Sequence, residues 1–310
     1  DTGKLYRETK TQANYIAEYY DYFAGLADKV EGTVVPIDKP DMQVTTTRIP
    51  IGVVAAIIPW NSQMLLTAVK LAPALAMGNT VVIKASELAP VTLLEFAKLI
   101  EKTGIPKGVI NIITGLGEPC GKALTTHSLV ERIAFTGGPE TAKHIVKNSA
   151  ENLSQVSLEL GGKSPVVVFD DAEQENALNG ITAGIFGASG QSCIAGSRLY
   201  LQSKIYDEFL KKLINKAEKI KLGGPMEKDT QMGPLNSFKQ LENIEKNIKA
   251  TIEQGGKVKC GGKRSSVSNK GYYFPATIIE CENHNLPVAE NELFGPILSV
   301  MKFEKEEEVI

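Results

Sequence analysis

The side chain best suited to covalent chemistry in this sequence is Cys193, which lies in the glycine-flanked segment Gly190–Arg198. The preceding residues Glu173–Ser189 predict a helix, and Leu199–Leu201 predicts a short strand. Glycines at such a junction let backbone N–H groups approach a ligand closely. A cysteine among small residues is more often a buried hydrophobic side chain, so the remaining chain must decide whether Cys193 is a nucleophile.

A second candidate is Glu159, which has Leu158 and Leu160 on either side. Desolvation in an apolar run would raise the pKa of the carboxyl toward the range useful to a general base at neutral pH. The alternative is a buried, ion-paired glutamate that holds a domain junction.

Alternating strands and helices are predicted between Ile51 and Gly161, and a second α/β series begins at Ser164–Phe169. The first series has near-continuous apolar strands, which favour a parallel sheet covered by helices on both faces. Ligands of such sheets bind at the carboxyl ends of the strands. The predicted strands of the first series are Gly52–Ile58, Thr80–Lys84, Val109–Ile113 and Arg132–Phe135.

Polar and glycine residues follow these strands, as a dinucleotide site requires. Trp60 and Asn61 follow the first strand, and Lys84 ends the second, three residues before Glu87. A lysine and a glutamate so placed could both hydrogen-bond ribose hydroxyls. The segment Gly115–Gly121 resembles G-x-G-x-x-G with one residue too many before its last glycine, so it could also be only a tight strand-to-helix turn.

The composition excludes several classes of function. The 34 basic and 36 acidic residues are mixed along the sequence, which leaves no signature for nucleic acid or an anionic membrane. The four cysteines are irregularly spaced, which fits neither a disulfide framework nor a zinc site. The sequence shows no membrane-spanning run and no signal pattern. We therefore expect a cytoplasmic protein without a metal, nucleic-acid or membrane partner.

Five motifs occur in the order and approximate spacing of the aldehyde dehydrogenase superfamily, and the chain resembles the NAD(P)-dependent, free-acid-forming branch over essentially its whole length. The motifs are Ile58–Asn61, Phe135–Gly137, Leu158–Lys163, Gly190–Cys193 and Glu292–Pro296. Members of that family are longer at both ends, so we expect the chain to be a fragment.

The resemblance implies a catalytic role for three residues. Cys193 would be the nucleophile and Glu159 the general base, while Asn61 and the backbone N–H of Cys193 would form the oxyanion hole. The reaction implied is the oxidation of a small-molecule aldehyde to a carboxylic acid through a thiohemiacetal and a thioester.

The resemblance also implies a nicotinamide cofactor. Lys84 and Glu87 would hold the adenosine ribose, Glu292 the nicotinamide ribose, and Phe294 would pack near the nicotinamide. NAD is expected over NADP, because the Glu87 carboxylate would repel a 2′-phosphate. Further contacts are implied for Trp60, Gly117, Thr136, Gly137, Gly138 and Leu160.

The chain departs from the family pattern at several positions. Ala142 stands where the family's turn has its second glycine. Ser62 and Gln63 stand where many members carry an aromatic residue and a proline, and Val69 stands where many have a large aromatic, at positions expected to face the substrate tunnel. A wider or more polar entrance, and hence a functionalised aldehyde, is predicted.

Two other readings stay open. A coenzyme A-acylating relative would pass the thioester to a thiol, but those relatives commonly lack the base that Glu159 supplies. The other possibility is that the chain is not an enzyme, but a non-catalytic subunit or a catalytically incompetent fragment of the same fold.

The expected fold is α/β, with a Rossmann-like parallel-sheet domain, a second α/β domain and a protruding β-hairpin. Residues 1–31 and 51–161 would form the dinucleotide-binding domain and residues 162–310 the catalytic domain, both incomplete. Residues 32–50 would form an oligomerisation hairpin with strands Thr33–Ile37 and Gln43–Ile49. The full-length protein would be a homodimer or homotetramer.

Overall fold

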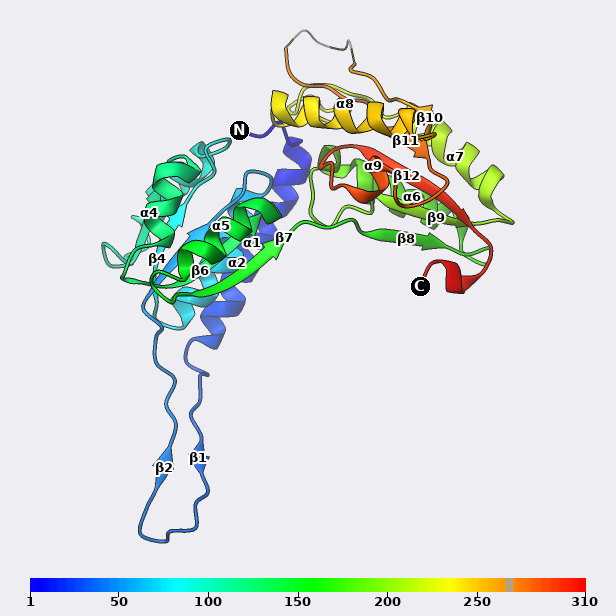
Figure 1. Ribbon diagram of the computed structural model, residues 1–310. Coiled ribbons are helices and arrows are strands. Elements are labelled where there is room, and N and C mark those ends of the chain that lie inside the picture. The colour runs from blue at the N-terminus through cyan, green and yellow to red at the C-terminus, as the bar shows by residue number, and fades with distance from the viewer. Residues whose placement is uncertain (266, 268–269) are drawn as a thin grey trace. The chain divides into compact units, whose positions relative to one another are not determined.

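The computed structural model describes residues 1–265, 267 and 270–310. It divides into two compact units, unit 1 with Asp1 and Lys10–Leu160, and unit 2 with Thr2–Thr9 and Gly161–Ile310. Each unit contains a five-stranded sheet covered by helices (Figure 1). The expected α/β class is confirmed.

The sheet of unit 1 is parallel, with strand order β5-β4-β3-β6-β7. The chain runs outward from β3 through β4 to β5 and then returns to the other side of β3, so its winding reverses between β3 and β6. Such a switch point is where open α/β sheets bind ligands. The strands are β3 (Val53–Ile57), β4 (Thr80–Lys84), β5 (Ile110–Ile113), β6 (Val130–Gly137) and β7 (Gln155–Leu160).

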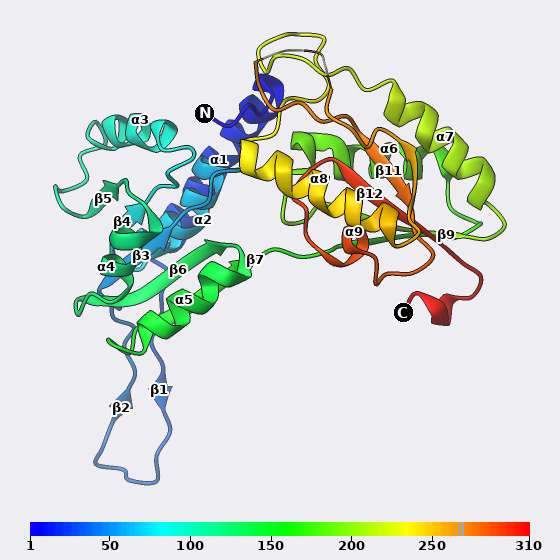
Figure 2. The same ribbon diagram turned by 45° about the horizontal axis from the view of Figure 1, so that its top comes forward.

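Helices cover both faces of this sheet, because successive strand side chains point to opposite sides and those on both sides are apolar. Val54 and Ala56 pack with α2 and α3, whereas Ala55 and Ile57 pack with α4 and α5. Helix α5 lies along β6 and β7 (Figure 2). The helices of unit 1 are α1 (Tyr6–Leu26), whose residues up to Thr9 are assigned to unit 2, α2 (Gln63–Ala76), α3 (Val91–Ile100), α4 (Lys122–Thr125) and α5 (Pro139–Ser149), with a short π-helical turn η1 (Gly117–Gly121) before α4.

The hairpin forms, but its strands are shorter than predicted. Only β1 (Val34–Val35) and β2 (Val44–Thr45) pair, in antiparallel register. Val34 is exposed, and none of the core clusters of the described residues includes a hairpin side chain. The ribbon extends away from the sheet of unit 1 (Figure 1), and a ribbon of two strands is marginally stable by itself.

The sheet of unit 2 has the order β10-β11-β12-β9-β8, with only β10 antiparallel to its neighbour. Its strands are β8 (Pro165–Val168), β9 (Arg198–Gln202), β10 (Lys257–Cys260), β11 (Thr277–Glu280) and β12 (Ile297–Phe303). One core cluster joins the sheet to α6 and α7, and another joins it to α8 and α9. The helices are α6 (Gln174–Phe186), α7 (Tyr206–Glu218), α8 (Phe238–Glu253) and α9 (Pro287–Glu290), with 3₁₀ turns η2 (Gly187–Gly190) and η3 (Glu306–Glu308).

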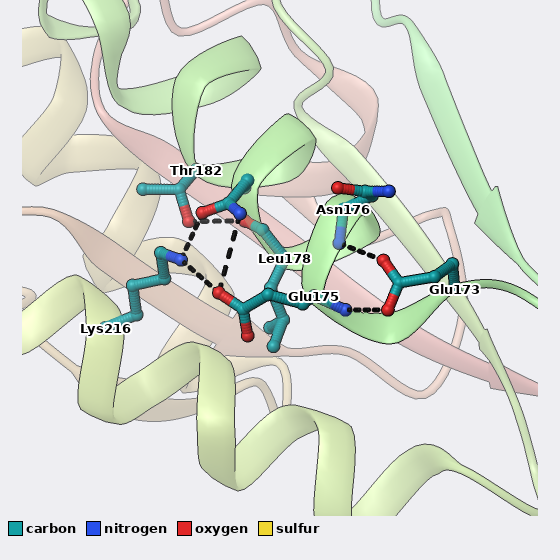
Figure 3. Close-up of polar contacts among 7 residues, drawn as sticks. Glu173, Glu175, Asn176, Leu178, Thr182 and Lys216 are labelled. Carbon is teal, nitrogen blue, oxygen red and sulfur yellow. Dashed lines mark hydrogen bonds and ion pairs between the residues drawn. The ribbon is translucent and has the colours of Figure 1, made fainter.

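Helix α6 leads into the segment that carries Cys193, and its start is fixed by polar contacts (Figure 3). The Glu173 carboxylate accepts hydrogen bonds from the backbone N–H groups of Glu175 and Asn176, which caps the helix. Lys216 of α7 pairs with Glu175 at 3.3 Å. The apolar core that α6 shares with α7, including Ile185 and Phe186 at the end of α6, holds the two helices together.

Candidate active site

A cavity of about 530 Å³ lies at the carboxyl ends of the unit 1 strands, a volume typical of small-molecule sites. Its walls come from the segments after β3, β4 and β5 and from the start of α5. The structure therefore brings together seven of the residues predicted to bind a cofactor, namely Trp60, Lys84, Glu87, Gly117, Thr136, Gly137 and Gly138.

Lys84 and Glu87 differ sharply in exposure. The Lys84 side chain is 6% exposed and the Glu87 side chain 46% exposed, with 3.4 Å between Nζ and Oε2. Lys84 Nζ also donates to the carbonyl of Ala85 at 3.1 Å. The ammonium is thus anchored at the cavity wall, while the carboxylate can accept hydrogen bonds from a ligand.

The start of α5 supplies a second kind of contact. No side chain among the described residues caps this helix, whose first residue Pro139 follows Gly138. Backbone N–H groups at a helix start attract anions, phosphates in particular. A Cβ at Gly117 or Gly138 would meet no atom within 4 Å, so the backbone is approachable there. These features supply the hydrogen-bonding groups and the approachable backbone that a dinucleotide requires.

Asn61 and Trp60 are half-buried in the loop between β3 and α2. The side chain of Gln63 is buried, and its Nε2 donates to the carbonyl of Ala89 at 3.3 Å. Val69 lines a second cavity of unit 1 with Lys70 and Glu159.

This second cavity, of about 670 Å³, contains a buried lysine that the sequence analysis did not single out. Lys70 Nζ donates to Thr136 Oγ1 at 2.7 Å, and Thr136 pairs in register with Glu159 across β6 and β7. Burial lowers the pKa of Lys70 to about 8, and the negative charge of Glu159 only partly opposes that effect. The sequence feature that could have identified Lys70 is a lone lysine within the apolar sequence of α2.

The expected burial of Glu159 is wrong. Glu159 is exposed at the end of β7, and Leu158 and Leu160 are each more than a third exposed. Leucine neighbours predict burial only where the sheet is covered, and the exposure of three successive side chains shows that neither face is covered at the carboxyl end of β7, the edge strand. Leu160 does not line the 530 Å³ cavity.

In unit 2, Cys193 lies in the predicted loop between η2 and β9. This loop packs against the segment of Glu292 and Phe294. A Cβ at Gly190 would lie 2.1 Å from the carbonyl oxygen of Gly295, and Gly190 has φ +69°, so glycine is required there. Two of the five sequence motifs therefore adjoin each other.

Glu292 and Phe294 line a small cavity with Ser192, next to Cys193 in the sequence. Phe294 has φ +51°, an uncommon conformation for a non-glycine residue. Its carbonyl accepts a hydrogen bond from Gln240 Nε2 of α8 at 3.0 Å, which helps to hold that conformation. Burial raises the pKa of the Glu292 carboxyl, while a hydrogen bond from the Gly162 N–H opposes the rise.

The other thiols of unit 2 are poorly suited to nucleophilic chemistry. Cys260 and Cys281 are buried, and burial raises the pKa of each to about 11. A thiol with so high a pKa carries little thiolate at neutral pH. Cys193 is half-buried and Cys120 of unit 1 likewise.

Two classes of feature are not found in the part of the chain that the structure describes. None of its helices is long and apolar enough to cross a membrane. No group of three or more His, Cys, Asp or Glu residues is placed to hold a metal ion.

The parallel sheet of unit 1 has a cavity at the carboxyl ends of its strands, which is the ligand-binding arrangement of open α/β folds. The model of the aldehyde dehydrogenase family matches residues 1–310, and the chain belongs to this family. The resemblance found in the sequence is confirmed.

Several characterised relatives are similar over the whole chain. It is 56% identical to (Z)-2-((N-methylformamido)methylene)-5-hydroxybutyrolactone dehydrogenase of Acinetobacter baylyi and 42% identical to betaine aldehyde dehydrogenase of Bacillus subtilis. It covers 63% and 64% of these proteins, respectively, so it spans less than two thirds of their length.

Solved structures of aldehyde dehydrogenases are similar to this chain over nearly its whole length. Betaine aldehyde dehydrogenase from Staphylococcus aureus in complex with NAD⁺ has a TM-score of 0.97 at 40% identity, with 99% of this chain and 61% of that chain covered. The NAD⁺ complex of aldehyde dehydrogenase from Bacillus cereus has a TM-score of 0.96 at 39% identity, with 100% and 62% covered.

Proposed function

We propose that the protein oxidises an aldehyde to a carboxylic acid with NAD as the hydride acceptor. The observation that carries the proposal is the packing of the Cys193 loop on the segment of Glu292 and Phe294, through the close approach of Gly190 to Gly295. It supports a nucleophile and a nicotinamide-binding segment that act together in a family whose relatives are named as aldehyde dehydrogenases.

The proposed chemistry begins at Cys193. Its thiolate attacks the aldehyde carbon and forms a C–S bond, and the carbonyl oxygen becomes an oxyanion. The side-chain amide of Asn61 and the backbone N–H of Cys193 donate hydrogen bonds to this oxyanion, each worth about 3 to 4 kcal/mol in a preorganised site. A bound nicotinamide supplies the chemistry of hydride acceptance, and a thioester is left on the sulfur.

Glu159 completes the reaction as the general base. Its carboxylate removes a proton from a water molecule, the water oxygen attacks the thioester carbon, and the C–S bond breaks to release the acid and the Cys193 thiolate. The exposure of Glu159 in the structure supports access for water. The presence of this carboxylate favours hydrolysis over transfer of the acyl group to coenzyme A.

The cofactor is proposed to be NAD, with NADP less favoured. The 530 Å³ cavity of unit 1 supplies the residues for the adenosine end, and Glu292 and Phe294 of unit 2 are assigned to the nicotinamide end. The solved relatives from Staphylococcus aureus and Bacillus cereus are described as NAD⁺ complexes. The half-exposed Glu87 carboxylate is the group that would disfavour a 2′-phosphate.

We propose a polar, functionalised aldehyde as the substrate class. The Acinetobacter relative is named for a hydroxybutyrolactone that carries an N-methylformamide group, and the Bacillus relative for betaine aldehyde. Val69 is a small side chain beside Lys70 in the 670 Å³ cavity, which supports a wide entrance for the substrate.

We also propose a cytoplasmic location, from the cysteine content, and subunit association through the β1–β2 ribbon.

The decisive experiment is spectrophotometric. The protein is mixed with simple alkyl aldehydes and with amide- or ammonium-bearing aldehydes, with NAD⁺ or NADP⁺, and reduced cofactor is followed by absorbance. We expect turnover with NAD⁺ that is fastest for the functionalised aldehydes and is absent in Cys193→Ala. Full activity in that variant would contradict the proposal.

A further inference from the structure

The Glu292 carboxylate sits in unusually tight contact with the segment that follows β7. A Cβ at Gly161 would lie 1.7 Å from Glu292 Oε2, so the carboxylate occupies the space that any other residue would fill. The backbone N–H of Gly162 donates a hydrogen bond to the same carboxylate. Glu292 Oε1 is buried and has no hydrogen-bond partner among the described residues.

Lys163, the next residue, borders the same cavity of about 10 Å³ as Glu292. Its backbone carbonyl accepts a hydrogen bond at 2.7 Å from Nε of Arg198, the first residue of β9. Two charged groups act on its ammonium at neutral pH: Arg198 repels it, whereas Glu292 attracts it.

These charges matter because both groups are partly withdrawn from water. Burial and Arg198 lower the pKa of Lys163 to about 8, so the ammonium is still charged at neutral pH. Burial raises the pKa of Glu292, and the Gly162 N–H and the Lys163 charge both lower it. The charge of Lys163 thus favours an ionised Glu292, the form that accepts hydrogen bonds.

We propose that Lys163 is a positioning residue for Glu292. Gly161 provides the space, Gly162 one N–H donor and Lys163 the charge, and together these three consecutive residues form a seat that keeps the carboxylate ionised and in one orientation. The consequence for cofactor binding rests on the proposed function, in which Glu292 accepts hydrogen bonds from the nicotinamide ribose. A carboxylate that became protonated or turned would lose those bonds.

The seat is tested first without cofactor. Melting temperatures at pH 7 are measured for the parent protein, Lys163→Met, Glu292→Gln and the double variant, with exposed Lys239→Met of α8 as the control. We expect the double variant to melt about 3 °C above the value predicted by adding the two single effects, because each single change leaves a charge unopposed. Strict additivity would overturn the proposal.

Cofactor binding is tested next through the fluorescence of Trp60, the only tryptophan of the sequence, which lines the unit 1 cavity. We expect Lys163→Met to weaken NAD⁺ binding about tenfold, and to cause no further loss when Glu292 is already Gln. Additive losses would contradict action through Glu292. An unchanged dissociation constant in Glu292→Gln would instead refute the proposed ribose contact, and the melting experiment would still decide whether the seat exists.

Discussion

Replacement of Lys70 by methionine should stabilise the protein at neutral pH. The side chain is 8% exposed, and burial lowers its pKa from 10.5 to about 8. At about 1.4 kcal/mol for each pKa unit, the charged lysine costs about 3 kcal/mol of folding free energy. The variant also loses the hydrogen bond to Thr136, worth about 1 kcal/mol. The expected gain in unfolding free energy is therefore about 2 kcal/mol at pH 7.

The sign of the pH dependence follows from the same values. Between pH 8 and 10.5 the unfolded chain holds a proton on Lys70 that the folded chain has lost, so the stability of the parent rises with pH in this window. Below pH 8 the free-energy cost of burying the charged Lys70 is fully present, and above pH 10.5 it has vanished. The advantage of Lys70→Met should therefore shrink as pH rises.

Urea unfolding of the parent and of Lys70→Met at pH 7 and pH 10 measures both effects. Lys147→Met, an exposed lysine of α5, is the matched control and should change stability by less than about 0.5 kcal/mol. A destabilised Lys70→Met at pH 7 would refute the reasoning, because it would mean that attraction to Glu159 outweighs the cost of burial.

Three further outcomes are expected. Glu87→Ser should move the ratio of kcat/KM values toward NADP, and a ratio that does not change would remove Glu87 from the choice of cofactor. Gly190→Ala should cost more than about 3 kcal/mol in urea unfolding, because its Cβ would overlap the Gly295 carbonyl, whereas Gly184→Ala in α6, with open space around it, should be neutral or stabilising. Iodoacetamide should label Cys193 well before Cys281 in the folded protein, as read by mass spectrometry of peptides, and equal rates would mean that burial does not protect the second thiol.

The sequence predicted the parallel sheet of unit 1 because its strands are short apolar runs that end in polar residues. It did not predict β7 as an edge strand, and burial of Glu159 was therefore inferred wrongly from its leucine neighbours. Strand order depends on pairing between distant segments, which local hydrophobicity does not encode. The hydrogen bond of Gln63 to Ala89 was not predicted for a similar reason, because it joins residues 26 positions apart.

The sequence predicted those candidate residues whose type and position after a strand were enough to suggest a role. The seven residues of unit 1 that are proposed to bind the cofactor line one cavity, because all of them lie at or just after the carboxyl ends of strands of the same sheet. Lys70 and Lys163 were missed because a lysine in an apolar or glycine-rich segment reads as an ordinary surface charge. Their importance arises from burial and from a facing carboxylate, which only the folded structure brings into view.

The central step of the proposed function is a thioester that forms on Cys193 and is hydrolysed with the help of Glu159. The direct measurement mixes Glu159→Gln with NAD⁺ and an aldehyde that the parent oxidises, stops the reaction in acid and locates acyl groups by mass spectrometry. Exposed Glu151→Gln is the control and should behave like the parent. The account predicts a burst of about one equivalent of reduced cofactor for each chain and an acyl group on Cys193. Normal turnover without a trapped acyl group, or an acyl group on Cys120, would contradict it.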